Sequence, residues 1–190
     1  MSNYIHNILK KVVLRKENVM KKIVMIIAPE NFRDEELSIP KSVFEGAGAT
    51  VHVASTSLEQ AKGKLGMKIK PDILVKDIRV ENYDAVVFVG GTGALCYFNN
   101  KIAHDIAKNA YLKNKLICAI CAASVILANA GVLEGKKATV FSSFEIDLKQ
   151  KGAIYTGEPV QVDGNIVTAD GSQSAERFAR EIIKLLNKND

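Results

Sequence analysis

The 190-residue chain has no tryptophan, only three cysteines and three histidines, and no long hydrophobic run. Its longest apolar stretches, such as IVMIIA (23–28) and AVVFVGG (85–91), are far too short to cross a bilayer. An odd number of cysteines without a secretory leader argues against a disulfide framework and for a reducing compartment. We therefore expect a cytoplasmic protein without a membrane partner.

The net charge of +5 could indicate a nucleic-acid partner, but the pattern needed for one is missing. The lysines are scattered, acidic residues are interspersed from Glu30 to Glu181, and no basic stripe alternates with aromatic residues. Charge of this kind affects solubility and non-specific attraction rather than recognition. With 47% hydrophobic and 25% charged residues, the chain is typical of a globular domain and no nucleic-acid partner is expected.

The first 21 residues differ from the rest of the chain. Apolar residues recur there at helical spacing, and basic residues lie between them. The apolar residues are Ile5, Ile8, Leu9, Val12 and Val13. No continuous apolar core or small-residue cleavage site follows, which disfavours a signal peptide. We predict a basic amphipathic helix over 1–21 that packs on its own domain or on a partner subunit. A targeting segment, a membrane-surface helix and a translation start at Met20 remain alternatives.

From residue 22 onward, buried strand patterns alternate with helical patterns. We expect strands at 22–28, 50–55, 85–91, 115–120 and 137–141, and helices at 34–47, 93–112, 122–130, 144–152 and 175–188. Residues 67–75 are predicted to be an extended excursion from the main sheet, and Asp163-Gly164 predicts a hairpin over 159–170. The predicted fold over 22–190 is a single α/β domain, a flavodoxin-like doubly wound sandwich with a mostly parallel central sheet and helices on both faces.

In such folds active sites lie at the carboxyl ends of strands. Four suggestive segments fall there, at 29–36, 90–93, 121 and 141–143. The stretch KLICAICAAS (115–124) poses the sharpest question, since Cys118 and Cys121 form a C-x-x-C. A metal or redox pair, a catalytic nucleophile and core packing are the alternatives.

A zinc site needs about four ligands, and Cys96 with three scattered histidines does not complete one. No metal or cofactor is therefore expected. Cys118 lies within an apolar strand and Cys96 within ALCYF, so both are predicted to be small buried side chains.

Cys121 differs because it follows the strand directly, among alanines, where a nucleophile elbow would place its sulfur. Backbone N–H groups at the start of the next helix would favour the thiolate, lower the pKa of the thiol and hold an oxyanion. From these residues alone, catalysis and packing are equally supported.

Three motifs together resemble the DJ-1/ThiJ/PfpI superfamily: AICAAS (119–124), FVGGTGA (88–94) and EELSIP (35–40). The resemblance extends over roughly 22–187 and implies that Cys121 is the nucleophile and Glu36 its acidic partner. It further implies that the backbone amides of Gly91 and Ala122 form the oxyanion hole, and that the protein is a homo-oligomer. A carboxyl beside a thiolate suffers repulsion and desolvation, which raise its pKa, so Glu36 is expected to stay protonated and to shuttle a proton.

The chain departs from the family at the histidine. One branch has histidine directly after the cysteine, where Ala122 stands, and another has it at the end of the following strand, where Phe141 stands. The chain's own histidines do not fill this gap: His6 is in the leader, His52 is expected to be packed or at an edge, and His104 solvated in mid-helix. Losing this base weakens a protease mechanism, which must protonate a leaving amine.

We therefore expect an enzyme that acts on small reactive carbonyls, glyoxalase- or deglycase-like, without a cofactor. A PfpI-like intracellular peptidase with peptide substrates, whose assembly supplies the base, is one alternative. The other is a non-enzymatic oxidation sensor or chaperone in which Cys121 becomes a sulfinate stabilised by Glu36.

Overall fold

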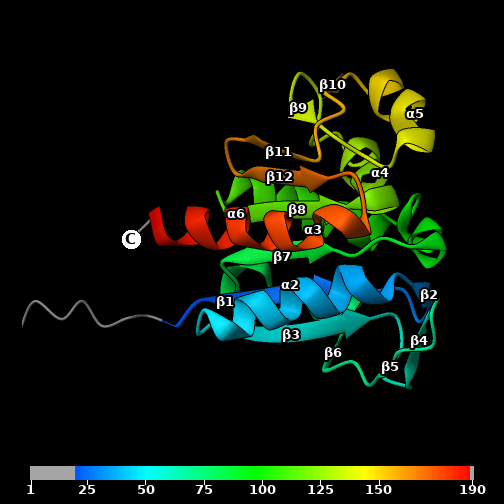
Figure 1. Ribbon diagram of the computed structural model, residues 1–190, viewed down its shortest axis with the longest axis vertical. Helices are drawn as coiled ribbons and strands as arrows, with labels where there is room; N and C mark the ends of the chain where they lie inside the picture. The colour runs from blue at the N-terminus through cyan, green and yellow to red at the C-terminus, as the bar shows by residue number, and fades with distance from the viewer. Residues whose placement is uncertain (1–19, 189–190) are drawn as a thin grey trace, which may run out of the picture.

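A seven-stranded sheet runs through the middle of the computed structural model, which describes residues 20–188 (Figure 1). The strand order is β11-β12-β8-β7-β1-β3-β6. These strands are β1 (Lys22–Ile26), β3 (Thr50–Ser55), β6 (Ile73–Leu74), β7 (Ala85–Phe88), β8 (Leu116–Ile120), β11 (Val160–Asp163) and β12 (Ile166–Ala169). All neighbours pair in parallel except β11 and β12, which form the predicted hairpin. The predicted fold class is confirmed.

Helices cover both faces of the sheet, because side chains alternate along each buried strand. Helices α2 (Asp34–Gly46) and α6 (Ala175–Lys188) lie on one face, and α3 (Lys101–Leu112) and α4 (Ser124–Asn129) lie on the other (Figure 1). On β1, Ile23 and Met25 pack with the first pair of helices, whereas Val24 and Ile26 pack with the second. Each side chain in this alternation is buried, which contributes about 1.5–3 kcal/mol for a large aliphatic residue.

Shorter elements decorate the carboxyl edge and the upper end of the sheet (Figure 1). A three-stranded sheet consists of β2 (Glu30–Phe32), β4 (Ala61–Gly63) and β5 (Lys68–Ile69), and a two-stranded one of β9 (Lys137–Ala138) and β10 (Ile154–Tyr155). The remaining helical elements are η1 (Val75–Asp77), η2 (Val80–Asn82), η3 (Thr92–Tyr97), η4 (Cys121–Ala123), η5 (Ser142–Phe144), α5 (Glu145–Gln150) and η6 (Ser172–Ser174).

Three predicted elements differ in detail. The strand expected at 137–141 is only the two-residue β9, because the Thr139 N–H donates to the Thr168 side chain at 2.9 Å instead of joining the central sheet. The helix expected at 93–112 is divided into η3 and α3, because the Asn100 side chain accepts from the Ala103 N–H and begins a new helix. Within 67–75, β5 leaves the main sheet as predicted, but β6 forms its edge.

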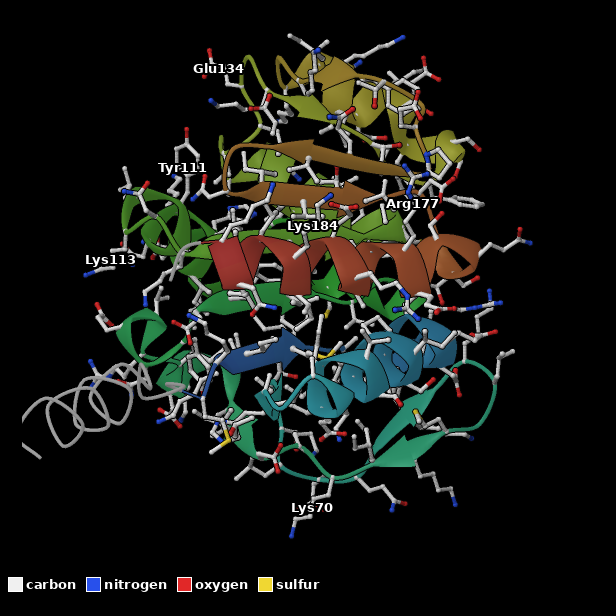
Figure 2. All side chains as sticks on the ribbon, turned by 60° about the vertical axis from the view of Figure 1, so that its left-hand side comes forward. Lys70, Tyr111, Lys113, Glu134, Arg177 and Lys184 are labelled. Atoms are coloured by element: carbon white, nitrogen blue, oxygen red, sulfur yellow. The ribbon has the colours of Figure 1, made fainter. Side chains whose placement is uncertain are left out.

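Lysines are spread over separate parts of the surface. Figure 2 shows Lys70 beyond β5, Lys113 after α3 and Lys184 on α6, all pointing outward in different regions of the molecule. Within residues 20–188, helices of sufficient length and apolarity to cross a membrane are absent. The predicted amphipathic helix over 1–21 lies almost wholly outside the described residues, so it and the domain boundary at residue 22 remain predictions.

Candidate active site

The candidate site lies at the carboxyl edge of the sheet, where the order of strand connections reverses. From β1 the chain moves outward to β3, and then returns to the other side of β1 as β7 and continues to β8. Loops that follow the strands on either side of such a reversal leave a crevice between them. Here the crevice is a cavity of about 410 Å³. All four residues predicted from the sequence, Glu36, Gly91, Cys121 and Ala122, line it.

Cys121 has the backbone conformation of an elbow. It follows β8 directly and has a φ of 60°, whereas Ile120 before it is extended, with φ −126° and ψ 142°. A positive φ is costly for a residue with a side chain and is retained where the surrounding structure imposes it. The turn leaves Cys121 half-buried on the cavity wall, whereas Cys118 inside the strand is fully buried, as predicted.

Two backbone amides converge on the Cys121 sulfur. The backbone N–H groups of Ala122 in η4 and of Gly91 in the loop after β7 both lower the pKa of the Cys121 thiol. Gly91 has a φ of 95°, and a Cβ there would lie 2.5 Å from both the Arg33 nitrogen and the Asn31 carbonyl oxygen. Glycine is therefore required for this approach. Amides aimed at one point can stabilise negative charge on the sulfur or on an oxygen formed beside it.

Glu36 brings a carboxyl group to the same place from the first turn of α2. Its side chain is only 1% exposed, and Oε2 has no hydrogen-bond partner among the described residues. Burial raises the pKa of Glu36 to about 7, although the Cys121 thiol, the Gly90 backbone and Arg33 lower it. The predicted direction of this shift is confirmed, and burial is its largest cause.

The predicted pKa of Cys121 is wrong in direction. Burial first, and then the charge of Glu36, raise the pKa of the Cys121 thiol to about 12, while the amides of Ala122 and Gly91 lower it. Desolvation and the neighbouring carboxylate therefore outweigh the two amides. The two groups titrate as a pair that binds two protons below about pH 7 and one proton between about pH 7 and 12.

Cys96 is exposed, so its predicted burial is also wrong. The 3₁₀ geometry of η3 repeats every three residues and turns Ala94 and Tyr97 inward, which leaves Leu95 and Cys96 on the surface. Burial of part of its side chain nevertheless raises the pKa of Cys96.

Neither described histidine lines the cavity. His52 is packed as predicted, with Nδ1 2.9 Å from the Tyr83 hydroxyl. His104 is part-buried rather than solvated, since its Nε2 lies 2.8 Å from the Phe98 carbonyl oxygen. His6 lies outside the described residues. Phe141, which stands where a related branch has histidine, does line the cavity and is 48% exposed.

Two cationic residues at the cavity, Arg33 and Lys64, were missed by the sequence reasoning. Lys64 lies in the turn between β4 and β5, far from every recognised motif, and its only sequence signal is the pair of flanking glycines in GKLG (63–66). The rest of the lining is Thr92, Leu95, Ser143, Phe144, Gly171 and Ser172. Groups of three or more histidine, cysteine, aspartate or glutamate side chains able to hold a metal ion do not occur between residues 20 and 188.

A family of known proteins matches most of the chain. The family model described as DJ-1/PfpI family matches residues 21–185. The chain belongs to the DJ-1/PfpI family. The resemblance drawn from the three motifs is therefore confirmed.

Individual relatives also match most of the chain. An uncharacterized protein of Methanocaldococcus jannaschii is 43% identical over 180 residues, which cover 93% of this chain and 88% of the relative. A protein of Thermococcus kodakarensis named a deglycase is 32% identical over 163 residues, covering 86% and 98%. The crystal structure of a ThiJ/PfpI domain protein from Brachyspira murdochii superposes with a TM-score of 0.87 at 36% identity, covering 89% and 98%.

Proposed function

We propose that the chain is a cysteine-dependent enzyme that converts small reactive carbonyls without a cofactor, in the manner of a glyoxalase or deglycase. The observation that carries the proposal is the pairing of Cys121, held on a strained elbow, with Glu36, a buried carboxyl whose pKa is raised to about 7. The deglycase name of a relative at 32% identity supports the same class of substrate.

The thiolate nucleophile forms by transfer of a proton from Cys121 to Glu36. Between about pH 7 and 12 one proton remains on Glu36 and Cys121 together, so the thiolate forms when that proton moves to the carboxyl. Because the proton stays within the pair, the thiolate forms without releasing a proton to solvent, a release for which the pKa of the thiol is about 12. Glu36 then holds the proton that the next step consumes.

On an α-oxo aldehyde the Cys121 thiolate adds to the aldehyde carbon, and the new C–S bond gives a hemithioacetal. The Gly91 and Ala122 amides stabilise the oxygen while Glu36 supplies its proton. The Glu36 carboxylate next removes the hydrogen of that carbon as a proton, and returns it to the adjacent carbon once a hydroxyl proton has moved between the two oxygens. The first carbon is thereby oxidised to a thioester and the second is reduced to a secondary alcohol, so no external oxidant is needed.

Water completes the cycle. Glu36 takes a proton from the water that attacks the thioester carbon, the C–S bond breaks, and a 2-hydroxy acid leaves. The cysteine and the carboxyl return to their starting states with one proton between them. A peptidase would need an additional acid for its leaving amine, and the histidines of the described residues lie outside the cavity.

The test is turnover of methylglyoxal to lactate, measured beside casein cleavage. Wild-type protein and a Cys96→Ser control, which removes the exposed thiol, are expected to form lactate, and Cys121→Ser is expected to form none. Casein cleavage without lactate would support the peptidase alternative. Absence of both activities, with Cys121 oxidised by mild peroxide, would support the sensor alternative and contradict the proposal.

A further inference from the structure

Lys64 belongs to a turn at the cavity that is anchored to α2, the helix that carries Glu36. Lys64 lines the same cavity as Cys121, and its backbone N–H donates to the Phe32 carbonyl at 2.8 Å. Its side chain belongs to the short turn between β4 and β5. The position of this turn therefore decides where the charge of Lys64 lies relative to the sulfur.

Asp34 fixes that turn. Its nearly buried carboxylate accepts the Leu65 N–H at 2.8 Å on Oδ2 and the Met67 N–H at 2.7 Å on Oδ1. A Cβ at Gly63 would lie 2.6 Å from both carboxylate oxygens, so the backbone packs directly against Asp34. Hydrogen bonds from backbone amides to a carboxylate are among the stronger ones in proteins. The turn that carries Lys64 is thus rigidly positioned by α2, two residues before Glu36 on the same helix.

The two cationic residues of the cavity lining, Arg33 and Lys64, differ in whether they have an ion-pair partner. Arg33 is paired with Glu35, with Nε 2.9 Å from Oε2. No carboxylate of residues 20–188 forms an ion pair with Lys64. Glu36 and Cys121 share one proton above about pH 7 and so carry a single negative charge between them. This charge and that of Lys64 offset one another, and Lys64 is the cationic residue of the cavity lining that forms no ion pair with a carboxylate of residues 20–188.

We propose that Lys64 forms an anion subsite and that the preferred substrates are reactive carbonyl compounds that also carry a carboxylate. The carbonyl carbon lies at Cys121 and the carboxylate lies towards Lys64. A cationic side chain on the cavity wall that has no ion-pair partner attracts an anionic group of a ligand and orients it. The substrate class rests on the proposed function, whereas the anion subsite itself can be measured without any turnover.

The first experiment measures the subsite alone. Iodoacetate and iodoacetamide both alkylate Cys121 when the thiolate displaces iodide, the C–I bond breaking as the C–S bond forms, and they differ only in the carboxylate. The ratio of the two rate constants, read by mass spectrometry of the Cys121 peptide, is expected to fall about 3- to 10-fold in Lys64→Gln and further in Lys64→Glu. Lys62→Gln, on β4 outside the cavity lining, is the matched control and is expected to keep the wild-type ratio.

The second experiment measures substrate choice. 4,5-Dioxopentanoate and its methyl ester are α-oxo aldehydes that differ by one negative charge. Wild-type kcat/KM is expected to favour the acid over the ester, and Lys64→Gln is expected to reduce this preference by about the same factor as the alkylation ratio.

The two experiments separate the two ideas. An alkylation ratio that is the same in Lys64→Gln and wild type would overturn the anion subsite, whatever the turnover. A ratio that falls as expected, in a protein that converts neither dicarbonyl, would leave the subsite standing and reject the proposed function.

Discussion

Gly90 lies so close to Glu36 that a Cβ on the glycine would be 2.5 Å from the carboxyl Oε2. The same Cβ would be 2.8 Å from the Cys121 Cβ, so the side chains of Glu36 and Cys121 both pack against the Gly90 backbone. The absence of a side chain at Gly90 therefore leaves the space that the Glu36 carboxyl and Cys121 occupy.

Gly90→Ala is therefore expected to separate the pair. Overpacking at a buried position costs about 1–3 kcal/mol of stability, and a displacement of the order of one ångström can lower turnover about 100-fold. Dicarbonyl turnover and urea denaturation would both be measured. Gly46→Ala is the control, because a Cβ there meets no atom within 4 Å. Wild-type turnover in Gly90→Ala would show that close contact of the pair is unnecessary.

Glu36→Gln is expected to retain alkylation of Cys121 better than turnover. The amide can still donate a hydrogen bond to the sulfur, but it has no proton to transfer, and loss of general acid–base catalysis typically costs about 10²–10⁴-fold. Iodoacetamide labelling and methylglyoxal turnover of the same preparation provide the two readouts. Equal turnover in the variant and the wild type would exclude the proton-shuttle role.

Activity should depend on pH through the pair. Below about pH 7 both groups are protonated and no thiolate is available, whereas above it one proton remains and can reside on Glu36. The kcat/KM for methylglyoxal is thus expected to rise through an apparent pKa of about 7 and then to level off. A profile that is flat from about pH 5 to 9 would contradict this assignment.

The free energy of unfolding should also depend on the protonation of Glu36, but it should fall as the pH rises, whereas activity increases. The pKa of Glu36 is raised from 4.5 to about 7, so the folded state binds its proton more tightly than the unfolded chain does. The associated stability is complete below pH 4.5 and is lost as pH rises through about 7, by roughly 3 kcal/mol. Relative to Glu36→Gln, wild type should therefore lose free energy of unfolding across this interval. If the difference in free energy of unfolding between wild type and Glu36→Gln, measured by urea denaturation, is the same at all pH values, burial of Glu36 has no such effect.

Mild peroxide is expected to oxidise Cys121 before Cys96, and Cys118 last. Burial raises the pKa of both Cys121 and Cys96, but only Cys121 has a carboxyl beside it to accept its proton. Cys118 is fully buried. Peptide mass spectrometry over a peroxide series gives the order, with Cys96→Ser to remove the competing exposed thiol. Faster oxidation of Cys96 would show that exposure outweighs thiolate formation at the elbow.

Local patterns predicted much of this molecule. The buried strands were recognisable from their apolar runs. Short motifs correctly placed Cys121 at the end of a strand and Glu36 near the start of a helix. Two kinds of information were out of reach. The exposure of Cys96 depends on a 3₁₀ rather than an α repeat in η3, and the pKa of Cys121 depends on how burial and Glu36 compare with two amides.

The place of Lys64 at the cavity could not be predicted from the sequence either. No spacing in the sequence relates it to Cys121, because the turn that carries it reaches the cavity only through the contacts of Asp34 with Leu65 and Met67. Three-dimensional structure was needed to bring this charge to the site.

The two acidic residues Asp34 and Glu36 in the first turn of α2 make separate contacts, and this separation has a consequence for substitution. Asp34 is committed to holding a loop, while Glu36, two positions later, is committed to the thiol. The side chain at position 64 can therefore change while the anchor and the proton carrier stay the same. Under the two proposals, substrate preference and thiol reactivity are set by separate residues, so that a substitution in one surface turn would change the preferred substrate and leave the reactive pair in place.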